Sequence, residues 1–310
     1  MSTRRDLLRF ASLATAAGWT FSLPKNAYGD ERAVNTEDTP NHRFHAETAA
    51  LRMTRFSPLL PSIPDQASVS LSPNGGYLSQ HAPAFRADGI VSFSSAYTHI
   101  SGVTDKLQGR GWGTFSTSVV EDLNIGDVVT ADRVVAQIFT EHPLNGYVPS
   151  VSFAGTHFEN LRISGRPLDI NLDLHMLGEK PADDLSYISE PGFRGRVQAQ
   201  SDDLASRRNI PAQALNRYIG APSAVANGEQ IEFSLLKSTR SDGTGAATGH
   251  VIHVPNIGTV HLATVNLLHE DYQQGTPRST TITMTMIETQ TNDTTIQLPT
   301  VKTNGGSGPG

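Results

Sequence analysis

The chain has 310 residues, of which 37% are hydrophobic and 17% charged, and it carries a formal net charge of -6. This length permits one large domain or two ordinary ones, and the low charged fraction excludes a disordered polyelectrolyte or a coiled coil. The absence of cysteine excludes disulfides, Cys-ligated zinc, iron–sulfur clusters and thiol catalysis. The acidic balance argues against nucleic acid as a partner.

Residues 1–29 have the organisation of an export signal. Basic residues come first, an apolar stretch covers residues 10–21, and the small-residue site at 27–29 offers a cleavage point. The apolar stretch is 12 residues long, whereas a membrane-spanning helix needs about 20. No later stretch is long enough either, so we expect no transmembrane span once the signal is removed.

The segment T-R-R-D-L-L-R at residues 3–9 resembles the twin-arginine (Tat) export signal of bacteria, with Leu7 where the pattern has Phe and Arg9 where it has Lys. The resemblance implies that the protein folds before export and then resides in the periplasm or outside the cell. Removing residues 1–29 leaves 20 basic and 29 acidic residues and a formal net charge of -9. Such a charge keeps an exported protein soluble and repels polyanions.

The mature chain is predicted to be all-β and mainly antiparallel, with a β-sandwich-like arrangement. Apolar and polar residues alternate with a period of two, and turn signals separate the runs. The clearest strands cover 91–95, 115–119, 128–139, 157–164, 168–175, 231–236 and 281–286.

These patterns divide the chain into segments: a spacer over 30–66 with a short helix at 46–55, a β unit over 67–178, an irregular, partly helical connector over 179–228, a second β unit over 229–298, and a flexible glycine-rich tail over 299–310.

Two short segments repeat one another. N-I-G-D-V at residues 124–128 matches N-I-G-T-V at 256–260, and each opens a β-rich run. The match is open to two interpretations: a duplication that makes two related β units, or two similar turn-to-strand junctions.

The chain from 113 to 174 also resembles β-rich bacterial surface proteins of the choice-of-anchor type. The resemblance is carried by the Ser/Thr-rich strand at 114–120, by L-N-I-G at 123–126 and by V-T-A-D at 129–132. It implies a β-rich surface protein and assigns no site residue. We expect no C-terminal anchor of that type, because the glycine-rich tail has no apolar span.

The candidate binding site is the glycine-flanked Trp112 in G-R-G-W-G, with Arg110, Tyr97 and Tyr147 nearby. An exposed indole ring beside a guanidinium group suits a sugar or peptide surface. The alternative is that Trp112 fills the sandwich core and that its glycine neighbours reflect close backbone packing.

A second candidate site is a metal centre. Asp169, Asp173 and His175 lie on the same face of one predicted strand. Their oxygen and imidazole ligands suit a divalent cation. His250, His253, His261 and His269 would supply further ligands from a neighbouring strand. The competing interpretation is a solvated polar face without metal.

The leading functional expectation is an exported, non-catalytic binding, adhesion or envelope-associated protein without a cofactor. Its partner would be a glycan or an envelope protein, and no nucleic acid. The alternative is a periplasmic metal-dependent enzyme, hydrolase-like, that uses the Asp/His cluster. No serine-hydrolase, zinc-protease or nucleotide-binding motif is present in the sequence.

Overall fold

The computed structural model describes residues 41–57, 62–87, 89–105, 111–144, 148–182, 185–208, 210–241, 247–255, 257–271 and 278–308. The predicted export signal, Arg110 and Tyr147 therefore lie outside the described residues.

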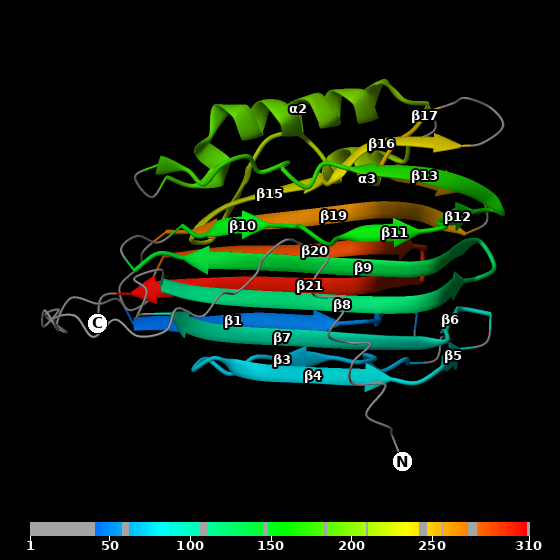
Figure 1. Cartoon of the computed structure of the whole chain (residues 1–310). Helices are drawn as coiled ribbons and strands as arrows, with labels where there is room; N and C mark the ends of the chain where they lie inside the picture. Colours follow the sequence, from blue (N-terminus) through cyan, green and yellow to red (C-terminus); the bar gives the residue numbers. More distant parts are fainter. Residues whose placement is uncertain are drawn as a thin grey trace, which may run out of the picture. The chain divides into compact units, whose positions relative to one another are not determined.

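Two large antiparallel sheets lie face to face, which confirms the all-β, mainly antiparallel prediction (Figure 1). The twelve-stranded sheet runs in the order β17-β16-β13-β12-β9-β8-β6-β5, with β10 and β11 added on β9 and with β7 pairing both β8 and β4. Its strands are β4 (Gly76–Ala82), β5 (Phe85–Ala87), β6 (Val91–Phe93), β7 (Ser95–Asp105), β8 (Gly111–Ile125), β9 (Val129–His142), β10 (Ser150–Ser152), β11 (His157–Glu159), β12 (Arg162–Ile163), β13 (Arg166–Leu172), β16 (Leu236–Ser241) and β17 (Ala247–Thr248).

The nine-stranded sheet runs in the order β14-β15-β19-β20-β21-β1-β3, with β18 on β19 and β2 on β21. Its strands are β1 (Asn41–Ala49), β2 (Arg52–Arg55), β3 (Val69–Ser70), β14 (Ser223–Val225), β15 (Gly228–Ser234), β18 (Val251–Val254), β19 (Gly258–Glu270), β20 (Ser279–Gln290) and β21 (Thr294–Gly308).

The main core lies between the two sheets, where alternate residues of the long strands meet. Val120 and Val134 from one sheet join Val265 and Met284 from the other in a single buried cluster. The Ser118 hydroxyl also links the sheets, since it donates to the Ala49 carbonyl at 3.1 Å. Residues 67–178 and 229–298 therefore supply most of the two layers of one core.

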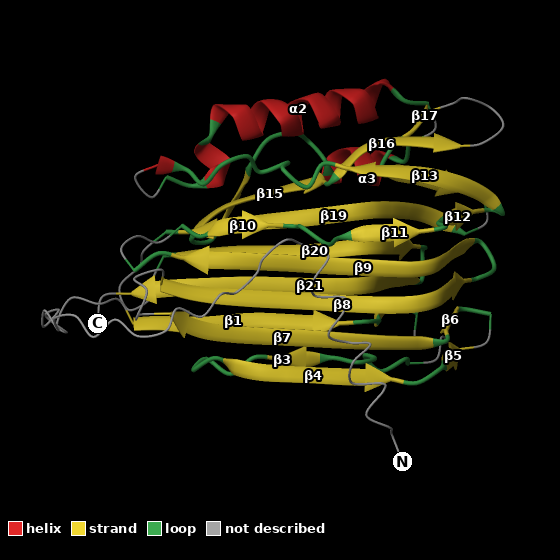
Figure 2. Cartoon of the chain, in the orientation of Figure 1, coloured by secondary structure: helices red, strands yellow, loops and turns green. Residues whose placement is uncertain are grey.

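The described helices lie at one edge of the sandwich (Figure 2). They are the 3-10 turn η2 (Tyr187–Ser189), α2 (Pro191–Ser206) and α3 (Ala212–Arg217). The ring centroids of Phe193 on α2 and Phe233 are 5.2 Å apart. The Gln200 side chain donates to the Ser234 carbonyl and accepts from the Ser234 backbone N–H. Helix α2 thus covers the place where the chain passes from β15 in one sheet to β16 in the other. The partly helical connector predicted over 179–228 contains all three.

Two local predictions are wrong. The segment predicted as a helix at 46–55 forms the end of β1 and all of β2. Ala46 and Thr48 point into the sandwich and β1 pairs along its length with β21, so sheet pairing overrides the helical preference of this sequence. The predicted flexible tail instead continues β21 to Gly308. Its glycines pair through the backbone, for example Gly305 with Phe44.

The described parts of the two N-I-G segments both lead into long strands. Residues 124–128 connect β8 to β9, and 257–260 enter β19. The Cδ1 atom of Ile257 lies 3.8 Å from the position of a Cβ atom on Gly126, so the two turns are neighbours in space.

Candidate functional site

Trp112 lies in the core, and the prediction that it presents its ring to a ligand is wrong. Its side chain is 3% exposed. The indole stacks on the His42 imidazole of the opposite sheet, with 4.8 Å between ring centroids and 10° between the planes. It also shares a buried cluster with Ile100 and Leu71. The physical reason is the pleat: residues 112, 114, 116 and 118 of β8 share the inner face.

Tyr97, the other described residue of the predicted binding site, lies on the outer face of the same sheet. Its hydroxyl accepts a hydrogen bond from Arg133 Nη2 at 3.1 Å. Arg133 Nε also lies 3.4 Å from Glu121. The outer face of β7, β8 and β9 therefore begins at one end with a polar cluster that fixes the Tyr97 ring.

A row of aromatic side chains crosses this outer face next to Tyr97. Tyr77 of β4 is in register with Ser101, Ser101 with Phe115, and Phe115 with Phe139. His99 lies between the rings, 4.3 Å from the Tyr77 centroid and 5.6 Å from that of Phe115. We call Tyr77, His99, Phe115 and Phe139 the aromatic face. Because adjacent strands lie about 4.8 Å apart, these four strands make a platform about 14 Å wide.

The aromatic face is open to solvent. Tyr77 is 66% exposed and Phe139 is 39% exposed, and neighbouring Val103 is 59% exposed. Gly113 leaves room for the Phe139 ring, since a Cβ atom on Gly113 would lie 3.4 Å from Phe139 Cε2. Clustered exposed apolar side chains with a polar rim are typical of binding surfaces rather than of inert protein surface.

The rim of the aromatic face consists mainly of uncharged hydrogen-bonding groups. In the next row in register, Ser79, Thr117 and Gln137 flank His99 of the aromatic face. Burial lowers the pKa of His99, which keeps its imidazole neutral at neutral pH. The nearest acid is Glu141, which follows Phe139 by two residues on β9 and is in register with Gly113, whereas Glu121 lies farther away beside Arg133. The face therefore suits a partner with hydroxyl groups and apolar ring faces and little charge.

A closed polar network covers the outer side of the nine-stranded sheet. Arg217 of α3 donates from Nε to Glu232 Oε1 at 2.7 Å and bonds both carboxylate oxygens of Glu288. Burial acts to raise the Glu288 pKa, but the bonds from Arg217 and Gln297 outweigh it and hold the pKa below its ordinary value. The Tyr218 hydroxyl reaches both His261 and Thr264. These bonds anchor α3 to the sheet, while His261 Nε2 has no hydrogen-bond partner among the described residues.

The structure does not assemble the predicted metal centre. Asp169 lies on β13, but that strand ends at Leu172, so Asp173 and His175 lie in a turn instead of on a strand face. The Asp173 carboxylate accepts from the backbone N–H of His175 at 3.0 Å. Within the residues that the structure describes, no three His, Asp or Glu side chains gather as a metal site.

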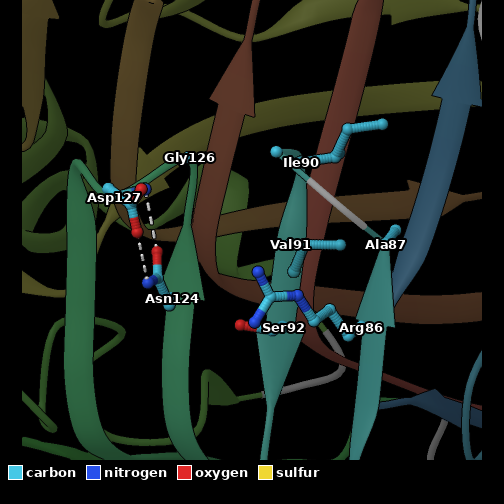
Figure 3. Close-up of a pocket in the computed structure, with 9 residues that line it drawn as sticks. Arg86, Ala87, Ile90, Val91, Ser92, Asn124, Gly126 and Asp127 are labelled. Atoms are coloured by element: carbon cyan, nitrogen blue, oxygen red, sulfur yellow. Dashed lines mark hydrogen bonds between the residues drawn. The ribbon is translucent and has the colours of Figure 1, made fainter.

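A small hollow lies at one end of the twelve-stranded sheet, between the β5–β6 hairpin and the β8–β9 turn (Figure 3). Asn124 and Asp127 close the turn by two 2.8 Å hydrogen bonds, one from each residue. The hollow has a volume of about 90 Å³, whereas ligand pockets occupy about 300–1,000 Å³. The hollow is therefore too small for a ligand, and the polar side chains of Asn124 and Asp127 stabilise the turn.

Over the described residues, no helix has the length and apolar character needed to cross a membrane.

Fold and site together define a β-sandwich protein with an aromatic outer face. The family described as "Domain of unknown function (DUF8256)" matches residues 42–268, which is most of the chain, and the chain belongs to this family. Neither the curated proteins nor the solved structures contain a match to it.

Proposed function

We propose that this chain is an exported, non-catalytic binding protein whose aromatic face binds neutral glycan chains. The observation that carries the proposal is the row of Tyr77, Phe115 and Phe139 on the outer face of β4, β8 and β9, in which Tyr77 and Phe139 are exposed and Phe115 is half-buried. A pyranose ring offers a face of C–H bonds that packs on an aromatic ring, and its hydroxyls bond the polar rim.

The mainly uncharged rim, the acid Glu141 beside Phe139 and the acidic chain support an uncharged glycan as the ligand. The formal net charge of -6 disfavours polyanions such as nucleic acids or sulfated polysaccharides. The flat, open surface suits an extended chain that lies across several rings, since a small soluble sugar would leave most of the platform in water. The twin-arginine resemblance supports export of the folded protein to a compartment where such glycans occur.

Affinity electrophoresis through gels that contain neutral polysaccharides tests this proposal. We expect retardation by at least one β-glucan, xylan or mannan, and direct titration with the corresponding hexasaccharide. Tyr77→Ala and Phe139→Ala should each weaken binding about tenfold, equivalent to about 1.4 kcal/mol. Tyr77 is mostly exposed, so the melting temperature of Tyr77→Ala should change by no more than a degree or two.

Phe56→Ala is the matched control, because Phe56 is 61% exposed and lies after β2, away from the aromatic face. It should bind like the unsubstituted protein. The proposal fails if no neutral polysaccharide retards the protein, or if Phe56→Ala weakens binding as much as Tyr77→Ala.

A further inference from the structure

A pocket of about 420 Å³ lies between α2 and β16, and the aromatic face does not include it. Helix α2 contributes Arg196, Ala199 and Gln200, and β16 contributes Leu236 to Thr239. Asp173 and Met176 from the turn after β13 and His250 from the segment before β18 complete the wall. The volume lies within the range of small-molecule sites, about 300–1,000 Å³.

Positive groups exceed negative ones in this pocket, on a chain whose formal net charge is -6. Arg207 is paired with Asp203 by bonds of 2.9 and 2.7 Å. Arg196 donates from Nε to the Met176 carbonyl at 2.9 Å, which fixes the guanidinium beside the pocket. Throughout the described residues no ion pair engages Arg196 or Lys237, so both cations remain able to bind an anion.

His250 is the second independent sign of a ligand. The side chain is 3% exposed, and its Nε2 atom has no hydrogen-bond partner within the described part of the chain. The ring meets the Tyr218 ring edge-on at 4.6 Å. Nε2 is enclosed in the pocket wall, so a ligand reaches it only where the ring or the wall shifts. A buried polar nitrogen left unpaired costs about 1–3 kcal/mol, and a bond from the ligand recovers that energy.

Burial, and then the nearby His261, Arg207 and Arg217, lower the pKa of His250 to about 3. The imidazole is therefore neutral at neutral pH and bonds a hydroxyl group, while the cations serve the charged part of a ligand.

We infer that this pocket binds a small organic anion of about monosaccharide size. Its carboxylate or phosphate group faces Arg196 and Lys237, a hydroxyl bonds to His250 Nε2, and its apolar side lies on Met176 and Leu236. Arginine and lysine both bind these anions, arginine through a planar pair of donors and lysine as a point charge.

Nuclear magnetic resonance titration of the full chain tests the inference with three probes that share a pyranose ring. D-glucuronate carries a carboxylate, D-glucose 6-phosphate carries a phosphate, and D-glucose is uncharged. We expect saturable shifts at Lys237, Ser238 and His250 with one or both anions, a dissociation constant below about 10 mM, and no saturation with glucose. The anionic probe that saturates the shifts at the lower concentration shows whether the pocket prefers a carboxylate or a phosphate.

Lys237→Gln should weaken anion binding at least fivefold, and Arg196→Gln should do the same. Arg194→Gln is the matched control on α2, because Arg194 is exposed and does not line the pocket. Lys237 is also exposed, so its variant folds even if Arg196→Gln does not.

The inference is overturned if neither anion saturates the signals, if glucose binds as well as the anions, or if Arg194→Gln weakens binding as much as Lys237→Gln. Tyr77→Ala should leave anion binding unchanged, so failure here is distinguishable from failure of the glycan proposal.

Discussion

Replacing Trp112 by alanine distinguishes a core role from a ligand-binding role. The indole is 3% exposed, stacks on His42 and packs in a cluster with Phe44, Ile100 and Leu71. Its removal leaves a cavity in that cluster, and truncation of a buried Trp costs about 3–5 kcal/mol of the free energy of unfolding. Each kcal/mol lowers the melting temperature of a domain this large by about 2 °C, so we expect a decrease of about 6–10 °C.

Urea unfolding followed by far-ultraviolet circular dichroism measures this loss, because the substitution removes the fluorescence of Trp112. Tyr77→Ala serves as the reference, since Tyr77 is 66% exposed. The folded fraction of Trp112→Ala should still bind neutral glycan, whereas Tyr77→Ala should be stable and bind weakly. A stability loss under 1 kcal/mol together with lost glycan binding would refute this reasoning and return Trp112 to the ligand-binding surface.

Two further predictions concern buried charge. Burial lowers the pKa of His42 to about 4 and the pKa of His142 and His250 to about 3. Each of these histidines therefore takes up a proton on unfolding below pH 6.5. As the pH decreases below that value, the free energy of unfolding should fall by up to about 1.4 kcal/mol per histidine per pH unit. Urea midpoints at pH 7, 6 and 5 check this, and a constant midpoint contradicts it. Glu288→Ala should cost about 3–5 kcal/mol because it removes one partner of a buried pair with Arg217, whereas exposed Glu229→Ala should stay within about 0.5 kcal/mol. Thermal unfolding of both variants compares them, and equal losses would contradict a structural role for the network.

The alternation of apolar and polar residues was sufficient to predict an all-β, mainly antiparallel fold, although not the order of the strands. Ile282, Met284 and Met286 are fully buried as their spacing predicts, and β20 covers that stretch. Leu168 lies on β13, but the strand predicted to continue to 175 ends at Leu172. Side chains 173–175 then enter a turn in which the Asp173 carboxylate bonds the backbone. A local hydrogen bond of this kind competes with strand continuation and leaves the alternation unchanged.

The faces of β19 on which His261 and His269 lie depend on one backbone irregularity, at Ala263. In an unbroken strand His261 and His269 would share a face, while His261 and Thr264 would lie on opposite faces. The Tyr218 hydroxyl nevertheless reaches both His261 and Thr264, because Ala263 between them has a φ of 49° and reverses the alternation. His269 bonds Thr280 instead. Alanine carries no sequence signal for a positive φ, so periodicity alone could not place these side chains.

Part of β8 buries polar side chains and turns an aromatic side chain outward, which is the reverse of what its hydrophobic pattern predicts. This arrangement supports a binding role for the aromatic face. Thr114 and Ser116 point into the sandwich, and neither hydroxyl has a hydrogen-bond partner among the residues described, whereas Phe115 points outward. A shift by one residue would bury Phe115 and expose these hydroxyls. The burial of residues such as Val120 and Ile138 in the core between the two sheets fixes the observed register of β8 and β9.

Packing of this strand alone therefore does not account for rings on the surface. The same is true of Tyr77 on the edge strand β4 and of Phe139 on β9, which is paired on both sides. Three aromatic side chains from three strands converge on one surface, and Tyr77 keeps most of its area in water. A binding partner that covers them explains both their exposure and their alignment, and Phe139→Ser should then reduce glycan binding while leaving stability within about 1 kcal/mol. Stability measured in urea, beside retardation in the polysaccharide gel, decides this: a loss of several kcal/mol would show that the ring supports the fold instead.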